Sequence, residues 1–394
     1  MKTITKLSGF LSLILLAVSF FFPESALLGT GVSMAIVSGT FSPKFTFNDT
    51  QIESFKELIY EDVFEKQDLK TFFSVIPNIK AGKKIGIVGR MTEIGRTKGA
   101  CDVTETDIEI PTIEKTWNPC SWGDRIPLCA ADLEDQFIVW GLNKGIRRPD
   151  LTDTDYADFI SEQVADGMLE SLYRLVFFGD TDAETVDASP AGDLTSGTDK
   201  ELFTCTDGIW KQVFAIVAAD SNRKVAISRN AEATYADQAF DDTDITNKVA
   251  TKIFRQLIQN STLKARANKN RFIICTQTLA DQYSNELESA TGVPPSWELI
   301  QNGIMKMTRM GVTIIAIPKW DDIIRTYFDN GTKYNLPHRA LMIDKENMAL
   351  GTEDEGSLSD MEMFYDKKSK KNYVDFLSKL DTKIIQDIMV QAAY

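Results

Sequence analysis

The chain has 394 residues, of which 43% are hydrophobic and 25% are charged, values typical of a globular protein that buries a core of its own. Its formal net charge at pH 7 is -14, which excludes a nucleic-acid binder that works by neutralising phosphates with a basic face. The charge is compatible with a protein that encloses nucleic acid without gripping it, because a negative wall does not hold the polymer.

The first residues form an apolar leader. Lys2 and Lys6 precede an uncharged run over residues 7–22, a pattern typical of an export signal and slightly short for a spanning helix. The cleavage region that follows is poor, because Glu24 stands where a small residue is needed. Two interpretations stay open at this point: a cleaved signal peptide, or an upstream extension of a protein that starts at Met34.

An amphipathic helix is predicted over residues 51–66, and a long β-prone region follows it. Two arms, residues 84–94 and 102–114, flank the polar tip 96–100, and Pro111 confines the second arm to a sheet edge. Arms of roughly 15 to 20 residues reach on the order of 50–65 Å, and a two-stranded ribbon cannot bury its dry face on itself. The arms are either two strands of an ordinary sheet or a protruding hairpin that lies across a neighbouring subunit.

Residues 152–178 are predicted to form one long amphipathic helix, on the order of 40 Å in length. Thr152 or Asp153 can cap its start, and Arg174 near its end agrees with the helix dipole. Its apolar stripe consists of Tyr156, Phe159, Ile160, Val164, Met168, Leu169, Leu172, Tyr173 and Val176. The polar segment 179–198 is expected to be a surface loop.

From residue 202 the sequence alternates between helical and strand patterns, which indicates an α/β domain. Helices are expected at 207–219, 246–259, from a Thr276 or Thr278 cap to 287, 297–307 and 321–328. Strands are expected at 271–275, 312–318 and 340–344, and then, in a return to β structure, at 361–365, 373–378 and 384–391. The basic run 367–371 is interpreted as a solvated bend between two of these last strands.

Motifs that carry chemistry are nearly absent. The chain has no dinucleotide- or phosphate-binding glycine loop, no nucleophile elbow and no HExxH pair. Its one histidine, His338, precedes a strand and is interpreted as an exposed loop residue. The five cysteines are widely spaced without a CxxC pair, and Cys275 lies in an apolar run, which favours free thiols in a reducing compartment and no zinc site. We therefore expect no enzyme, no cofactor and no metal ion.

The order of these parts resembles the major capsid proteins of tailed bacteriophages, the Hong Kong 97 fold family. The most specific segment is a succession of a strand at 272–276 with its helix, the strand MGVTIIAIP at 310–318, and the strand ALMID at 340–344. The resemblance covers residues 39–394. It implies an α+β fold with an N-terminal arm, an extended β-hairpin (the E-loop), a long spine helix in a peripheral (P) domain, and an α/β axial (A) domain.

The resemblance also implies a division of the chain and a set of contact residues. Its parts are the leader 1–35, the N-arm 36–75, the E-loop 76–130, the P-domain with the spine helix 131–201, the A-domain 202–348 and the returning P-domain strands 349–394. The apolar leader departs from the family, and a scaffolding remnant becomes a third interpretation of it. Contact with the next subunit is expected at the E-loop residues Ile85, Ile87, Val103, Ile108, Ile110, Ile113 and Trp117. The core of the spine helix is expected at Phe159, Ile160, Val164, Met168 and Leu172.

By this resemblance the chain is expected to be a structural protein of a bacteriophage virion. It would self-assemble through pentamers and hexamers into an icosahedral shell around double-stranded DNA, in the host cytoplasm. Its partners would be itself, the portal, and scaffold or maturation proteins, with no sequence-specific DNA contact and no membrane in the mature particle. A cellular encapsulating compartment of the same fold is a near alternative. The alternative from another class is an exported surface or ligand-binding protein with a cleaved signal peptide.

Overall fold

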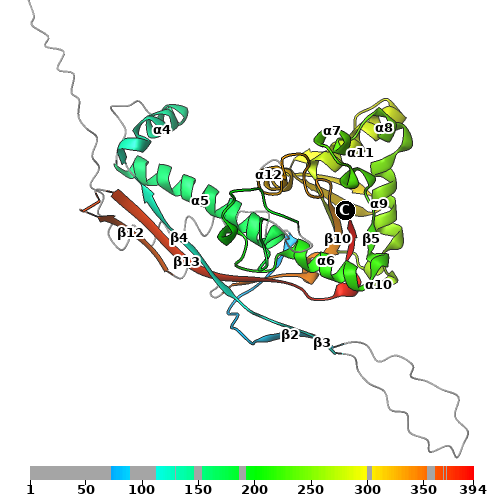
Figure 1. Ribbon diagram of the computed structural model, residues 1–394, viewed down its shortest axis with the longest axis horizontal. Coiled ribbons are helices and arrows are strands. Elements are labelled where there is room, and N and C mark those ends of the chain that lie inside the picture. Colours follow the sequence, from blue (N-terminus) through cyan, green and yellow to red (C-terminus); the bar gives the residue numbers. More distant parts are fainter. Residues whose placement is uncertain are drawn as a thin grey trace, which may run out of the picture. The chain divides into compact units, whose positions relative to one another are not determined.

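The structure is a computed structural model that describes residues 72–88, 112–128, 130–145, 153–185, 192–299, 304–352, 360–366, 368–369 and 371–394. The apolar leader, the helix expected at 51–66 and the ribbon residues Val103, Ile108 and Ile110 lie outside the described residues. The fold is α+β, and its described parts follow one another in the order that the resemblance implies (Figure 1).

One long helix and one long strand lie side by side in the fold (Figure 1). The helix, α5 (Asp153–Phe178), begins one residue later than predicted and ends where expected. The strand, β13 (Lys371–Ile384), pairs antiparallel with β4 (Cys120–Leu128), β12 (Asp360–Asp366) and β11 (Met348–Thr352), and β11 pairs in parallel with β1 (Ser74–Ile76). The even-numbered residues of β13 from 372 to 380 are buried, so this sheet has one dry face and one wetter face.

Seven strands form the second sheet, in the order β5-β14-β10-β6-β9-β8-β7. Their bounds are β5 Lys224–Val225, β14 Gln391–Ala393, β10 Ala340–Asp344, β6 Arg271–Thr276, β9 Val312–Ile317, β8 Met305–Arg309 and β7 Glu298–Leu299. One face is covered by α9 (Val249–Asn260) and α11 (Gln277–Thr291), whose apolar sides pack on alternate residues of β6, β9 and β10. Most of the other alternate residues of these strands are buried as well, which is why they appear in the sequence as nearly continuous apolar runs.

Shorter elements complete the described chain. The remaining α-helices are α4 Ala130–Asn143, α6 Ile209–Ala219, α7 Tyr235–Gln238, α8 Asp242–Asn247, α10 Leu263–Ala267 and α12 Pro318–Tyr327. Two further strands, β2 (Lys84–Val88) and β3 (Thr112–Thr116), form a separate two-stranded sheet.

The helix α4 lies against α5. The rings of Phe137 and Phe159 are 5.7 Å apart, and Trp140 Nε1 donates to Glu162 over 2.7 Å.

The end of α5 meets α6 and α12 in an aromatic cluster. The rings of Trp210 and Trp320 lie 5.4 Å apart edge to face, and Trp320 contacts Phe177 of α5 at 5.0 Å. The guanidinium of Arg339, which is 1% exposed, lies 5.2 Å from the centre of the Trp210 ring. Burial lowers the pKa of Arg339 to about 9, and the surrounding aromatic faces stabilise the charge that water no longer reaches.

The helix expected at 297–307 is wrong. The described part of this segment contains β7 and the start of β8 and no helix, and β8 pairs antiparallel with β9 from Met305 opposite Ala316 to Arg309 opposite Val312. Met310 and Gly311, with φ of 50° and 71°, form the two-residue turn between the strands. Pairing along the edge of β9 outweighs the weak helical preference of the segment.

The last expected strand, 384–391, is also wrong. The strand before it, β13, continues to Ile384, well beyond the expected end at residue 378. The chain then makes a short 3-10 turn at Asp387–Met389 and joins the seven-stranded sheet as β14. The apolar stretch is expected among the strands that return beside the spine helix. Its last residues pair instead with β10 and β5 of the seven-stranded sheet.

The start of α11 is capped by a residue far along the chain. The sequence assigns the cap to Thr276 or Thr278, but Thr276 makes no capping bond. Instead, the carboxylate of Asp321 accepts from the backbone N–H groups of Gln277 at 2.6 Å and Thr278 at 3.2 Å. A carboxylate of α12 therefore caps the N-terminus of α11, and this contact links the two helices.

His338 is a core residue rather than the exposed loop residue that the sequence indicates. It is 3% exposed, and its ring lies 4.3 Å from that of Phe240. Its Nδ1 is 2.9 Å from Thr278 Oγ1, and its Nε2 is 2.8 Å from the carbonyl oxygen of Gln238. Burial lowers the pKa of His338 to about 4, so the imidazole is neutral at neutral pH.

Two of the cysteines are bonded, contrary to the expectation of free thiols. Cys120 and Cys205 form a disulfide between Cα atoms that lie 5.5 Å apart. The pair is 85 positions apart in sequence, and only the folded chain brings β4 close to the connection between α5 and α6. Cys275 is a free, fully buried thiol in β6, as predicted, and burial raises its pKa.

Candidate assembly surface: the ribbon and its root

The ribbon of β2 and β3 pairs with neither larger sheet of the described chain. Its register runs from Lys84 opposite Thr116 to Val88 opposite Thr112, with Ile87 opposite Ile113. Lys84 and Glu114 form an ion pair whose side chains are 62% and 51% exposed, so it contributes little to stability. Ile85 is half-buried and packs at the edge of a small cluster at the foot of the ribbon.

The ribbon is rooted in the body by Trp117, the residue directly after β3. Its side chain is 1% exposed and packs with Ile79, Ala349 and Ile385. The socket depends on Gly351, because a Cβ at that position would lie 2.9 Å from Trp117 Cζ3 and 2.7 Å from Ile79. By the resemblance given above, Trp117 is predicted to contact a neighbouring subunit. That expectation is wrong, since the ring is buried inside its own chain.

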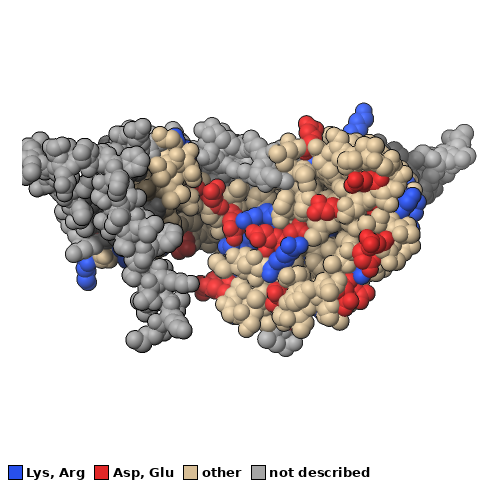
Figure 2. Space-filling model, turned by 90° about the horizontal axis from the view of Figure 1, so that it is seen from above, with Lys and Arg blue, Asp and Glu red and all other residues tan. Residues whose placement is uncertain are grey.

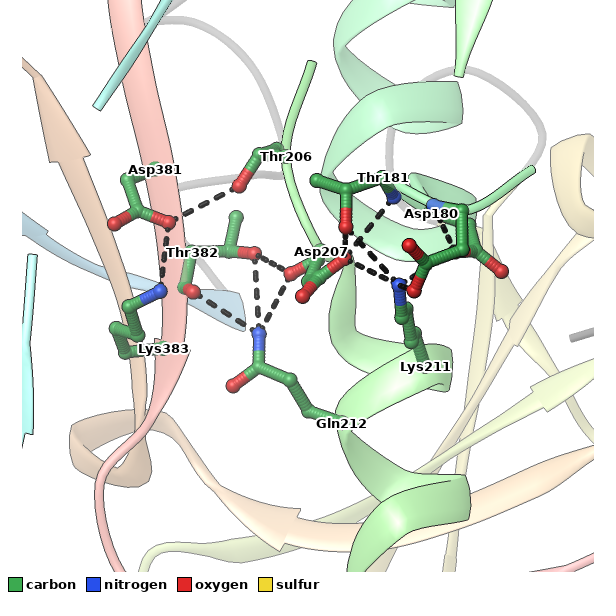
Figure 3. Close-up of polar contacts among 10 residues, drawn as sticks. Asp180, Thr181, Thr206, Asp207, Lys211, Gln212, Asp381, Thr382 and Lys383 are labelled. Carbon is green, nitrogen blue, oxygen red and sulfur yellow. Dashed lines mark hydrogen bonds and ion pairs between the residues drawn. The ribbon is translucent and has the colours of Figure 1, made fainter. Parts of the chain in front are cut away.

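Backbone hydrogen bonds and one buried carboxylate complete the root. Trp117 N donates to the carbonyl oxygen of Lys83 at 2.9 Å. Asp381 of β13, 1% exposed, accepts from the backbone N–H of Asn118 at 2.7 Å. Its other oxygen accepts from Thr206 Oγ1 and Lys383 Nζ, each at 3.0 Å (Figure 3). Asp381 thus connects the ribbon, β13 and the segment before α6.

A second set of polar contacts fixes α6 against β13 (Figure 3). Gln212 Nε2 donates to the carbonyl oxygens of Asp207 at 2.7 Å and Thr382 at 3.0 Å. Its Oε1 accepts from the backbone N–H of Ile384 at 2.8 Å. Thr382 Oγ1 donates to the carbonyl oxygen of Asp207 at 2.8 Å. One glutamine therefore satisfies backbone groups on both elements.

Lys211 forms ion pairs with three carboxylates next to this joint (Figure 3). Its Nζ lies 2.6 Å from Asp180, 2.6 Å from Asp182 and 2.9 Å from Asp207. Burial alone would lower the pKa of Lys211, but the hydrogen bonds to the carboxylates outweigh it and raise the pKa. Burial likewise opposes ionisation of Asp207, yet its bonds to Lys211 and Thr181 lower its pKa. The cluster is a charged structural joint between the end of α5 and α6.

The five residues expected in the core of the spine helix all lie in α5 and are at most 4% exposed: Phe159 3%, Ile160 2%, Val164 4%, Met168 2% and Leu172 0%. Next to them, a groove of about 800 Å³ separates α5 from β4 and β13. Its apolar floor includes Ile160 and Met168 of α5, Trp122 of β4 and Phe376 of β13. The Cys120–Cys205 disulfide lies in the wall of the same groove.

The expected ribbon residues are therefore divided. Ile85, Ile87 and Ile113 lie in the described base of the ribbon, and Trp117 is in its socket.

Sequence reasoning missed Asp381 and the Cys120–Cys205 pair. The signal for Asp381 is a break in alternation, because the strand has three consecutive polar residues, 381–383, between the buried Leu380 and Ile384. No local pattern marks the cysteine pair.

In the part of the chain that the structure describes, no group of His, Cys, Asp and Glu is placed to hold a metal ion. Within the same residues, no helix combines the length and apolar character needed to cross a membrane.

No protein-family model matches this chain, and no curated protein matches it. Among solved structures, it is similar to the capsid of the cyanophage P-SCSP1u, with 11% identity and a TM-score of 0.45 over 95% of this chain and 98% of that one. The satellite phage P4 procapsid, including its size determination protein, gives 12% identity and a TM-score of 0.44 over 84% and 95%. A virus-like particle from Pyrococcus furiosus gives 7% and 0.41 over 87% and 98%.

The chain is similar to phage capsid proteins. The identities are 12% or lower and the TM-scores are below 0.5, so the function has to be argued from the geometry of this chain.

Proposed function

We propose that this chain is a major capsid protein of the Hong Kong 97 type. In this proposal it self-assembles through pentamers and hexamers into an icosahedral shell that encloses phage double-stranded DNA. The observation that carries the proposal is the ribbon of β2 and β3, which is firmly rooted at Trp117 but pairs with neither larger sheet of the described chain.

The energetics of a two-stranded ribbon support this reading. An isolated hairpin is marginal in water, because it has no layer on which to bury its apolar face. Ile87 and Ile113 are register partners of β2 and β3, so apolar residues stand opposite each other in the ribbon. A neighbouring copy of the chain supplies the missing layer in a closed ring or shell. Stability then depends on assembly as well as on the single chain.

The charge distribution supports a container rather than a DNA-binding protein. The net charge is -14, and on the described part of the face in Figure 2 acidic and basic side chains are interspersed. On average such a surface repels DNA phosphates, and the described part of this face has no continuous row of basic side chains along which DNA could bind. The enclosed DNA would therefore be packed without sequence-specific contacts.

The remaining parts of the proposal follow from the same assignment. The chain divides into the N-arm, E-loop, P-domain and A-domain near the boundaries given above, except that β4 belongs to the β13 sheet and β14 belongs to the seven-stranded sheet. It acts as a structural protein rather than an enzyme. Its partners are other copies of itself, the portal, and scaffold or maturation proteins. It assembles in the host cytoplasm and ends in the virion, with no membrane in the mature particle.

The test is a charge at an apolar position in the described base of the ribbon. We expect Ile113→Asp to leave a folded monomer that forms no closed particles, because a carboxylate cannot be buried against the next subunit without a partner. Deleting residues 90–106 should have the same effect. Ile113→Val, which keeps the face apolar, is the matched control and should assemble normally.

Particle formation is measured by sedimentation and negative-stain electron microscopy, and folding of the monomer by thermal unfolding. Closed particles of normal size from Ile113→Asp and from the deletion would overturn the proposal. So would a wild-type protein that stays monomeric at high concentration in the presence of its scaffold and portal partners.

A further inference from the structure

The disulfide between Cys120 and Cys205 joins two parts that have different roles. Cys120 is the first residue of β4 and lies three positions after Trp117, at the root of the ribbon. Cys205 lies in the connection between α5 and α6, directly before Thr206. Closing this bond therefore ties the root of the ribbon to the connection that leads into α6.

Both cysteines line the groove between α5 and β4. Cys120 and Cys205 are half-buried and line this groove of about 800 Å³, which is within the range of about 300–1,000 Å³ that admits molecules of drug size. Cys275 provides the contrast, since it is fully buried in β6 and outside the groove. A small oxidant can therefore reach the pair and cannot reach the core thiol.

The two segments that carry the cysteines are also joined by hydrogen bonds that do not involve the sulfur atoms. Asp381 accepts hydrogen bonds from Asn118 N at 2.7 Å and from Thr206 Oγ1 at 3.0 Å. Asn118 is two residues from Cys120, and Thr206 directly follows Cys205. The Cα atoms of the cysteines are 5.5 Å apart, inside the range that a disulfide spans without backbone movement. The reduced chain can thus adopt the same fold with its thiols facing each other.

We propose that Cys120 and Cys205 form a redox clasp on the root of the ribbon. The clasp is open in a reducing cell interior, and it closes when the folded protein meets a small disulfide oxidant such as oxidised glutathione. This inference concerns the folded chain itself and does not depend on the proposed shell function.

Closure is a thiol–disulfide exchange in two steps. One protein thiolate attacks oxidised glutathione, forms a mixed disulfide and releases one glutathione thiolate. The second protein thiolate attacks the protein sulfur of the mixed disulfide and releases the second glutathione. Two S–H bonds of the protein are replaced by one S–S bond, two electrons pass to the oxidant, and the two protons end on the two glutathione thiols.

The first experiment determines the state of the thiols in the full-length protein. Cells with a reducing cytoplasm are lysed with a thiol-alkylating reagent, and we expect Cys120 and Cys205 to be alkylated. The unmodified protein, purified with reductant and then treated with oxidised glutathione, should lose two hydrogen atoms in mass and yield a cross-linked Cys120–Cys205 peptide. Cys205→Ser should abolish this product, whereas Cys101→Ser and Cys129→Ser should leave it unchanged.

Three results would overturn the clasp. They are a bond already present in the alkylated lysate, a stable glutathione adduct in place of the internal bond, or pairing of either residue with Cys101 or Cys129.

A second measurement tests the role of Asp381 in holding the pair. Thr206→Val removes one hydrogen bond with little change of shape, and we expect it to slow closure by about two- to tenfold, the effect of one hydrogen bond. Hydrogen exchange should slow on closure around residues 117–123 and 203–207 and stay unchanged in the seven-stranded sheet. Unchanged closure in Thr206→Val together with unchanged exchange at these segments would contradict the inference.

Discussion

The seven-stranded sheet and the root of the ribbon are stabilised in different ways. The sheet distributes its burial over many apolar residues of β6, β9 and β10, with helices packed on them. The root depends on a few individual groups: the Trp117 ring, the Asp381 carboxylate and the Cys120–Cys205 bond. A single substitution in the sheet removes only a small part of its stabilisation. A single substitution at the root removes a large part, because few groups stabilise it.

The largest expected effect comes from removing the ring at the root. Trp117→Ala should lower the free energy of unfolding by about 3–5 kcal/mol, because it leaves a cavity between Ile79, Ala349 and Ile385. Urea unfolding measures the loss, and hydrogen exchange should place it in β1, β2, β3 and β11. Trp117→Phe is the control and should lose less. Equal loss of protection throughout the seven-stranded sheet would contradict the separation of the two regions.

Acid should weaken the body of the protein around the seven-stranded sheet, because His338 is buried just before β10. The pKa of His338 is about 4 in the folded chain, below the value of about 6.5 for the unfolded chain. The unfolded state therefore binds the proton more readily, and this contribution to stability is complete above pH ~6.5 and falls towards pH ~4, by up to about 3 kcal/mol.

Unfolding midpoints between pH 7 and pH 4 measure this loss, with His338→Gln as the matched variant. The variant keeps a polar side chain but carries no titrating group, so its midpoint should fall less steeply with pH. Parallel curves for the two proteins would show that His338 makes no pH-dependent contribution.

The smallest effect is expected on the ribbon itself. Lys84→Ala removes the exposed ion pair with Glu114 and should change the free energy of unfolding by only about 0–1 kcal/mol, less in high salt. The comparison with Trp117→Ala at the same ionic strength sharpens the difference between the ribbon and its root. A loss as large as that of Trp117→Ala would mean that the ribbon contributes directly to the stability of the single chain.

Much of the fold could be predicted where one local pattern decides the structure. The apolar runs of β6, β9 and β10 and the helical period of α5 each fix an element without reference to the rest of the chain. The prediction fails at 297–307 because β8 exists only by pairing with β9. The alternation of Met305 and Met307 with polar neighbours was the available signal, and the turn at Met310 and Gly311 was the other.

The root could not be predicted for a similar reason. Trp117 has its socket in residues from three distant segments, and Asp381 acts on donors more than 170 positions away. The sequence pattern does not distinguish Trp117, which is buried in its own chain, from the apolar ribbon residues that are predicted to contact a neighbour. The glycine at 351, which makes room for the ring, is indistinguishable in sequence from any other glycine in a strand.

The position of β14 has a consequence for synthesis. This strand lies between β5 and β10 in the seven-stranded sheet, with Ala392 opposite both Lys224 and Leu341. On the ribosome, β5 and β10 emerge long before Gln391–Ala393, so the nascent polypeptide cannot close this sheet until those residues are translated. A chain that stops before Gln391 therefore lacks β14 and leaves the edges of β5 and β10 unpaired with each other.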